Sequence, residues 1–294
     1  MNNWLFLRGE IKSGSIVDND HDMWIQLFNE LKRGDNGEVW FKGQNVPRET
    51  NIVFARGGFD YYIPILKQLP NSYKIRYGAG RRYMPESEIK YDLVLVDTEN
   101  QKKEVLNKYP EPNVHLLIKP AAQHFEYIET KKEYDVCFIA RHKADFKGIK
   151  WVYANCPRDI SILHLGGDIN TVHPSNVTIK LVDRKDMPLL INQCKVGIVP
   201  YEDVDSCPRV IPEMLACGLP LVISEKTNVS HRFLFEFLGN NRMFVAGVKM
   251  RWVDFFDSVK TILSEEINYQ GIEDFYCRNL SIPISANHLR ECMK

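Results

Sequence analysis

Short apolar runs alternate with amphipathic segments along most of this 294-residue chain. Such runs are typical of strands that lie buried in a parallel sheet with helices on both of its faces. We expect strands over residues 4–7, 38–41, 51–55, 93–96, 115–118, 135–139, 160–165, 196–200, 221–223 and 243–245.

The segments between these runs place apolar residues at helical spacing. Residues 22–31, for example, gather Met23, Leu27 and Phe28 near one helical face, after an Asp-rich start that can cap the helix. We expect helices over residues 22–31, 61–69, 99–109, 188–194, 209–217 and 253–267.

The expected strands fall into two groups that divide at about residue 125. This division predicts an α/β protein with two doubly wound, Rossmann-like domains that face each other across a cleft, because such sheets bind ligands beyond the carboxyl ends of their strands. We expect an N-terminal domain over residues 1–125 and a second domain over residues 126–275. Residues 276–294 then form a terminal segment that can pack back on the first domain.

The overall charge of the chain is balanced, with 38 basic and 38 acidic residues. A neutral chain has no global field that would favour nucleic acid or an acidic membrane surface, although a local basic face stays open. Seven cysteines, an odd number without a CxxC pair, lie mostly in apolar segments and favour a reducing, cytoplasmic setting.

No targeting or membrane-spanning segment is expected. The N-terminus lacks the basic region and the long apolar region of a signal peptide, and no apolar stretch is long enough to span a bilayer. We therefore expect a cytoplasmic protein, with peripheral attachment to a membrane and a virus-infected cell left open as settings.

Two cations and two carboxylates stand at expected strand-to-helix junctions. Arg141 and Lys147 follow the strand at 135–139, while Asp205 and Glu213 follow the strand at 196–200. Cations neutralise a diphosphate, and carboxylates accept hydrogen bonds from ribose and sugar hydroxyls. This set of charges indicates an anionic, hydroxyl-rich ligand such as a nucleotide sugar.

These residues also resemble a known family, the GT-B glycosyltransferases and within them glycosyltransferase family 4. The sequence from Ala140 to Gly148 is similar to the family's G-R-x5-K-G element, with Ala in place of the first Gly. Asp205-x7-Glu213, followed by Ala216-Cys217-Gly218-Leu219-Pro220, is similar to its E-x7-E and A-x-G-x-P elements. The resemblance extends from about residue 51 to 222 and is more specific in the second half.

The resemblance implies an enzyme that transfers a sugar from a nucleoside-diphosphate sugar, UDP being favoured, with retention of configuration. Arg141 and Lys147 would grip the diphosphate and stabilise the leaving group, and Glu213 would hold the ribose. Asp205 would meet the hydroxyls of the sugar, and Gly166 would lie at the family's glycine-containing strand end.

Each assignment has a structural alternative. Arg141 and Lys147 could be solvated surface residues, Glu213 a helix-face carboxylate and Asp205 an ordinary helix cap. Where the family has glycines, this chain has Ser206-Cys207-Pro208-Arg209. Proline lacks an amide hydrogen, so we expect Cys207 and Arg209 to contact the donor, with the charge of Arg209 replacing a backbone donor.

The acceptor side is less defined, because the family's first-domain histidine is missing from residues 75–80. Asp18 and Asp20 follow the first strand and could orient or deprotonate an acceptor hydroxyl. Arg56 and Arg76 stand beside aromatic residues and could receive a phosphate-bearing acceptor. A solvated loop and a generic surface are the alternatives. No histidines have metal-site spacing, and we expect no metal cofactor.

We therefore predict a retaining glycosyltransferase that acts on a glycan or a lipid-linked glycan. One alternative is a phage-type enzyme that modifies a hydroxymethylated DNA base, against which the zero net charge counts. The other is a non-catalytic module that binds a nucleotide sugar without turnover.

Overall fold

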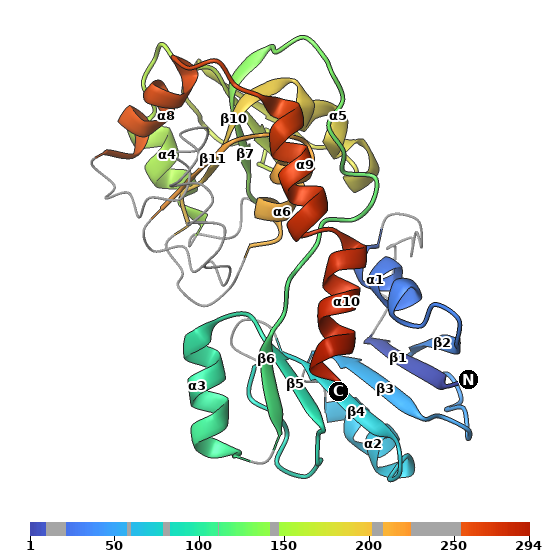
Figure 1. Cartoon of the computed structure of the whole chain (residues 1–294). Helices are drawn as coiled ribbons and strands as arrows, with labels where there is room; N and C mark the ends of the chain where they lie inside the picture. The colour runs from blue at the N-terminus through green and yellow to red at the C-terminus, as the bar shows by residue number, and fades with distance from the viewer. Residues whose placement is uncertain are drawn as a thin grey trace. The chain divides into compact units, whose positions relative to one another are not determined.

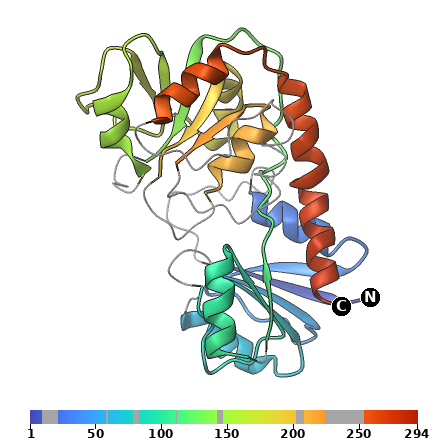
Figure 2. The same ribbon diagram turned by 60° about the vertical axis from the view of Figure 1, so that its left-hand side comes forward.

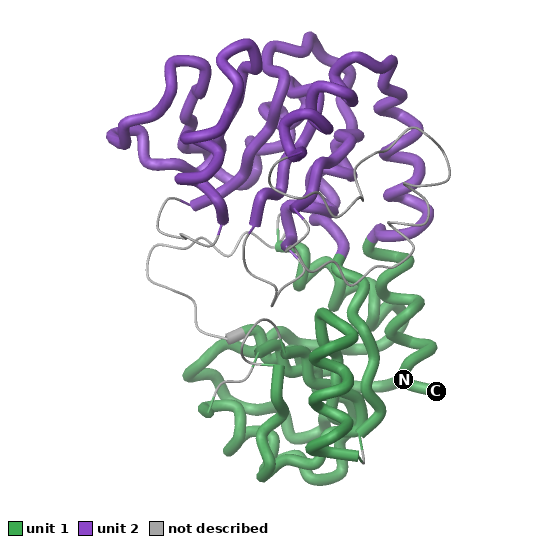
Figure 3. The backbone as a smooth tube through the Cα atoms, turned by 90° about the vertical axis from the view of Figure 1, so that its left-hand side faces the viewer, with its two compact units in different colours: residues 1–119, 282–294 green, residues 120–281 purple. Residues whose placement is uncertain are grey.

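The computed structural model describes residues 1–9, 22–57, 60–78, 83–110, 112–141, 147–201, 208–224 and 254–294. The chain forms two compact units, which Figure 3 shows in different colours. Unit 1 contains Met1–Lys119 and Ile282–Lys294, and unit 2 contains Pro120–Ser281. The chain therefore leaves unit 1 after Lys119 and returns to it at Ile282.

Unit 1 is built on a parallel six-stranded sheet with the order β2-β1-β3-β4-β5-β6. Its strands are β1 (Asn3–Gly9), β2 (Asn36–Phe41), β3 (Ile52–Arg56), β4 (Tyr73–Tyr77), β5 (Leu93–Val96) and β6 (Asn113–Leu116). Its helices are α1 (Met23–Leu31), α2 (Ile63–Gln68), α3 (Glu99–Lys108) and α10 (Ile282–Cys292), with a 3-10 turn η1 (Asp60–Tyr62).

Aromatic side chains hold α1 on one face of this sheet. The Phe6 ring stacks on Phe28 of α1 with the ring centroids 5.2 Å apart, and on Phe54 of β3 at 5.4 Å. Figures 1 and 2 both show α10 beside α1. The Ser285 hydroxyl of α10 donates to the Ile118 carbonyl just beyond β6, so the last helix is tied to unit 1.

The opposite face carries a separate apolar core. Leu7 of β1, Val53 of β3 and Val94 of β5 belong to this core, together with Leu66 of α2 and Val105 of α3. Because successive side chains of a strand alternate between faces, the buried residues of a strand such as β3 are divided between these two layers.

Unit 2 has a parallel five-stranded sheet with the order β11-β10-β7-β8-β9. Its strands are β7 (Tyr134–Ile139), β8 (Ile162–Leu165), β9 (Val177–Lys180), β10 (Cys194–Val199) and β11 (Leu221–Ile223). Its helices are α4 (Ile149–Asn155), α5 (Met187–Asn192), α6 (Val210–Ala216), α8 (Phe255–Leu263) and α9 (Tyr269–Asn279), with a 3-10 turn η4 (Arg184–Asp186).

Helix α6 has no solvent-facing side, since all of its residues from Val210 to Ala216 are buried. Trp151 of α4 stacks on Phe256 of α8 with the ring centroids 5.6 Å apart, which joins these two helices. No helix in the described part of the chain is long and apolar enough to cross a membrane.

Each expected strand that falls on described residues overlaps an observed strand, while the expected strand at 243–245 lies outside them. Strands β4 and β9 were not expected, because Lys74, Arg76 and Lys180 interrupt their apolar pattern. The expected helix at 188–194 is wrong at its end, since Cys194 begins β10. Helices α4, α9 and α10 were also not expected.

Candidate functional site

Charged residues gather where the strands of unit 2 end. Arg141 lies just beyond β7, and Lys147 precedes α4. Arg209 is the residue before α6, and Glu213 lies within that helix. Arg141 and Arg209 are exposed, Lys147 is half-buried, and the Glu213 residue is only 3% exposed. A buried carboxylate thus stands among cations at the carboxyl ends of β7 and β10.

Gly148 fixes the position of Lys147. Its φ of 72° is left-handed, and a Cβ atom at this position would lie 2.2 Å from the Pro200 carbonyl oxygen at the end of β10. Only glycine permits both features. The Lys147 ammonium lies 5.2 Å from the centroid of the buried Tyr201 ring, whose hydroxyl donates to the Ile139 carbonyl at 3.0 Å.

The electrostatic environment of Lys147 is predominantly positive. Burial lowers the pKa of its ammonium, and the charges of Arg141 and Arg209 lower it further, while Glu213 acts in the opposite direction. These four side chains therefore share one local field. A bound anion would offset the repulsion among the cations.

Glu213 forms an ion pair with Arg184, a residue that the sequence analysis did not single out. Arg184 belongs to η4, and its guanidinium lies 5.5 Å from the centroid of the Phe125 ring. The buried carboxylate is thus compensated by a cation from a different element. Charge-assisted pairing of this kind is what makes a buried carboxylate tolerable.

Gly166 lies at the end of β8, against the carbonyl that precedes Arg141. Its φ is 86°, and a Cβ atom there would lie 3.2 Å from the Ala140 oxygen. His164, which is fully buried, contacts the same carbonyl through Nε2 at 2.9 Å, and its Nδ1 lies 2.7 Å from the Tyr153 hydroxyl. Since a carbonyl only accepts, Nε2 carries a hydrogen. This network braces the backbone next to Arg141.

Four of the expected site residues lie outside the described residues: Asp18, Asp20, Asp205 and Cys207. Arg56 is half-buried at the end of β3, with its guanidinium carbon 4.8 Å from the centroid of the Trp24 ring of α1.

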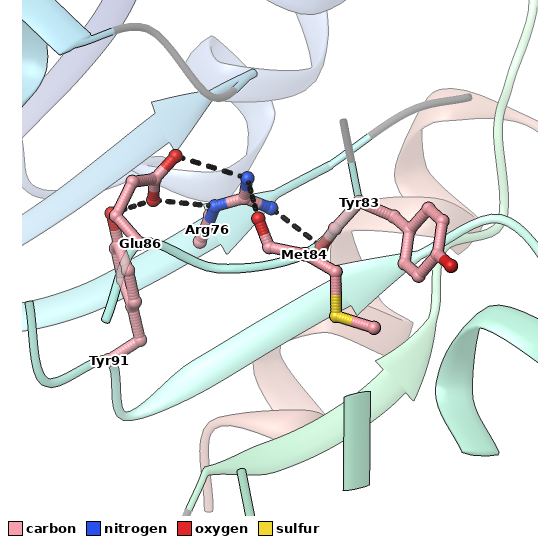
Figure 4. Close-up of polar contacts among 5 residues, drawn as sticks. All are labelled: Arg76, Tyr83, Met84, Glu86 and Tyr91. Carbon is pink, nitrogen blue, oxygen red and sulfur yellow. Dashed lines mark hydrogen bonds and ion pairs between the residues drawn. The ribbon is translucent and has the colours of Figure 1, made fainter. Parts of the chain in front are cut away.

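The prediction that Arg76 lies on an acceptor-binding surface is wrong. Its side chain is 1% exposed. Figure 4 shows its contacts with Glu86, Tyr83 and Met84. Nε donates to Glu86 Oε2 at 2.9 Å, and the guanidinium also donates to the carbonyls of Tyr83 at 2.9 Å and Met84 at 2.6 Å. Arg76 is paired in register with Val94, so it points toward the apolar layer under α2 and α3.

A second buried charge cluster lies at the ends of β4 and β5. The Asp97 carboxylate is inaccessible to solvent, and its Oδ1 accepts from Lys119 Nζ at 2.7 Å and from the Tyr77 hydroxyl at 2.8 Å. Among the described residues, no group of three or more His, Cys, Asp or Glu side chains could hold a metal ion.

Solved structures resemble this chain over nearly its whole length. A glycosyltransferase from Rickettsia africae superposes with a TM-score of 0.71 at 13% identity, over 100% of this chain and 98% of its own. Sucrose-phosphate synthase from Thermosynechococcus elongatus superposes with a TM-score of 0.68 at 12% identity, over 99% of this chain and 98% of its own. T4 phage BGT, in complex with UDP and Mn²⁺, superposes with a TM-score of 0.64 at 11% identity, over 100% of both chains.

No protein-family model matches the sequence, and the search of curated proteins finds no similar one. At identities of 11% to 13% the structural similarity establishes the fold, and it confirms the predicted fold class. The chain therefore has the GT-B fold of these transferases, with two Rossmann-like domains.

Proposed function

We propose that this protein is a glycosyltransferase that moves a sugar from a nucleoside-diphosphate sugar to a hydroxyl acceptor, with retention of configuration. The observation that carries the proposal is the cluster of Arg141, Lys147 and Arg209 around the buried Glu213. Three cations with one carboxylate suit a diphosphate linked to a ribose. The complex of T4 phage BGT with UDP supports a nucleotide ligand for this fold.

In the proposed reaction, Arg141 and Lys147 bind the diphosphate. Negative charge grows on the diphosphate as the sugar leaves, so fixed cations stabilise the transition state more than the ground state. Glu213 accepts hydrogen bonds from the ribose hydroxyls. The acceptor hydroxyl attacks on the face from which the diphosphate departs, and a diphosphate oxygen takes its proton.

UDP is the proposed nucleotide, and a glycan or lipid-linked glycan is the proposed acceptor. A hydroxymethylated DNA base is a less suitable acceptor, because duplex binding rests on many cationic contacts to phosphates and the chain has no net charge. We place the protein in the cytoplasm, where nucleotide sugars are available. Asp18, Asp20 and Arg56 are the proposed acceptor-side residues, and Asp205 and Cys207 the proposed additional donor contacts.

Calorimetry with UDP, followed by assays of UDP-sugar hydrolysis and transfer, tests the proposal. We expect UDP to bind and at least one UDP-sugar to be turned over. Binding without turnover across a broad panel of donors would identify a non-catalytic nucleotide-sugar-binding module. Failure to bind any nucleoside diphosphate would contradict the proposal entirely.

A further inference from the structure

Arg184 is the outer partner of the buried Glu213 carboxylate. The Arg184 side chain is 34% exposed, whereas that of Glu213 is 4% exposed, and the two form an ion pair. The residues lie 29 positions apart and come from η4 and α6. A ligand that reaches the carboxylate from solvent must therefore come close to the guanidinium.

Arg184 is contacted by two residues of the segment that precedes β7, His124 and Phe125. Its guanidinium lies 5.5 Å from the centroid of the Phe125 ring, and that ring is 3% exposed. The Arg184 carbonyl lies 3.3 Å from Nε2 of His124. A guanidinium held by an aromatic ring and an ion pair loses little further freedom when it binds a ligand.

Both members of the pair keep hydrogen-bonding capacity. A guanidinium has five N–H donors, and within the described residues only Nη2 of Arg184 contacts a carboxylate. A carboxylate has two oxygens, of which Oε1 of Glu213 receives Arg184. The pair therefore presents a hydrogen-bond acceptor for hydroxyls directly beside a set of donors.

A nucleoside presents the complementary groups side by side. The ribose 2′-hydroxyl and the minor-groove edge of the base lie next to each other, as the shallow groove of an RNA helix shows. Uracil and cytosine carry the acceptor O2 on this edge, and adenine carries N3. Guanine adds an amino group on this edge. The amino group is a hydrogen-bond donor, so it cannot accept a hydrogen bond from a guanidinium.

We propose that Arg184 contacts the minor-groove edge of the donor base and selects against guanine, while Glu213 binds the ribose. This inference rests on the proposed nucleotide-sugar function. Arg184 is then a specificity-determining residue. Its charge also offsets that of Glu213, so that the anionic donor does not approach an uncompensated carboxylate.

Calorimetry with UDP, CDP and GDP on the full chain tests the role of Arg184. We expect the unmodified protein to bind UDP and CDP at least about tenfold more tightly than GDP. A hydrogen bond from a charged donor contributes about this factor to the affinity. Arg184→Ala should weaken the binding of both nucleotides, because Glu213 loses its compensating charge, and should lower the ratio of UDP affinity to GDP affinity about tenfold. Arg184→Lys keeps the charge without the planar fork and should recover only part of the UDP affinity.

Lys185→Ala is the matched control, because Lys185 is the exposed neighbour of Arg184 in the same turn. It should leave all three affinities unchanged. Arg184→Gln, which retains donors without the charge, replaces Arg184→Ala if thermal unfolding shows that the alanine variant does not fold.

Two results separate this inference from the proposed function. If the unmodified protein binds no nucleoside diphosphate, both are wrong. If it binds UDP but shows no preference over GDP, or if folded Arg184 variants keep the same UDP-to-GDP ratio, the role of Arg184 is refuted and the proposed function stands.

Discussion

The two units use charged side chains in opposite ways. In unit 1 two buried cations have carboxylate partners of their own: Arg76 pairs with Glu86, and Lys119 pairs with Asp97. In unit 2 the buried Glu213 carboxylate lies in the field of several cations. The first arrangement stabilises a fold, and the second leaves positive charge for a ligand.

This contrast shows why the charge of the whole chain says little about its ligands. The chain is neutral, yet the pKa of Lys147 is lowered by burial and by the two neighbouring arginines, Arg141 and Arg209. Burial is the largest cause of this shift, and the further lowering of the pKa by the two arginines shows that positive charge gathers locally in a neutral chain. Mutation of the buried ion pairs of unit 1 should therefore change stability, and mutation of the cations near Glu213 in unit 2 should change binding.

The largest expected effect is on stability, from Arg76→Ala in unit 1. The change leaves Glu86 without the partner that compensates its partial burial, and breaking a buried pair typically costs about 3–5 kcal/mol. Denaturant unfolding measures the loss. Arg48→Ala, at an exposed position of the same unit, should change the free energy of unfolding by less than about 0.5 kcal/mol.

The pH dependence of the Arg76 effect gives a second measurement. Burial raises the pKa of the Glu86 carboxyl, but hydrogen bonds and charge from Arg76 outweigh burial and lower it. A lowered carboxyl pKa stabilises the fold above the unfolded value and loses this effect as the pH falls through the folded value. The difference in the free energy of unfolding between the unmodified protein and Arg76→Ala should therefore become smaller in acid. The two proteins should bind UDP with the same affinity.

The next largest effect is expected from Arg141→Ala and Lys147→Ala in unit 2. Each removes a charged contact to the diphosphate, so kcat/KM for the donor should fall. The fall should correspond to a loss of about 2–5 kcal/mol in transition-state stabilisation. Steady-state kinetics with a donor that turns over gives this value. Thermal unfolding should show little change, because Arg141 and Arg209 repel Lys147 and none of these charges stabilises another. Activity close to that of the unmodified protein in both variants would refute the diphosphate assignment.

Sequence patterns predicted the fold well where burial follows hydrophobicity. Strand β4 was not predicted, because Lys74 and Arg76 are buried charged residues that have partners inside the protein. Lys74 Nζ, for example, donates to the Pro70 and Ser72 carbonyls. These partners lie in turns whose path a strand pattern does not specify. A buried charge and an exposed one therefore look alike in the sequence.

The candidate site was predictable where its residues form a motif with fixed spacing. Arg141, Lys147 and Glu213 were found in this way, whereas Arg184 and His164 were not. The interest of Arg184 lies in its contact with Glu213, and that of His164 in its contact with the Ala140 carbonyl. Both contacts join separate elements, so no local spacing signals them.

Glu213→Gln should have a smaller effect than loss of the diphosphate cations. The amide keeps the volume of the side chain inside α6 but replaces a charged acceptor of ribose hydrogen bonds. Such bonds are worth about 1.5–3 kcal/mol, so the donor KM should rise more than kcat falls. Glu273→Gln, in the same unit on α9, is the control and should leave both constants unchanged. Unchanged KM and kcat in Glu213→Gln would make Glu213 a structural residue like Asp97.

A weaker effect is expected from pH. Because the pKa of Lys147 is lowered in the free protein, its ammonium loses a proton at a lower pH than an ordinary lysine does. A bound diphosphate favours the charged form and raises this pKa. Binding therefore takes up protons, and UDP affinity should fall as the pH rises through the lowered pKa of Lys147. Calorimetry in buffers of different ionisation enthalpy detects this uptake. Lys147→Ala should abolish it, and uptake that persists in the variant would assign it to another group.

The smallest effect is expected from removal of divalent metals. Arg141, Lys147 and Arg209 already supply positive charge where a metal-dependent transferase would place its cation, so excess chelator should leave donor turnover nearly unchanged. The complex of T4 phage BGT with UDP and Mn²⁺ shows that a protein of this fold can hold a metal, which makes the measurement informative. Loss of transfer that is rescued by Mn²⁺ or Mg²⁺ would show that the side-chain cations of unit 2 are insufficient. Asp18→Asn and Asp20→Asn would then test whether these two carboxylates supply the metal ligands.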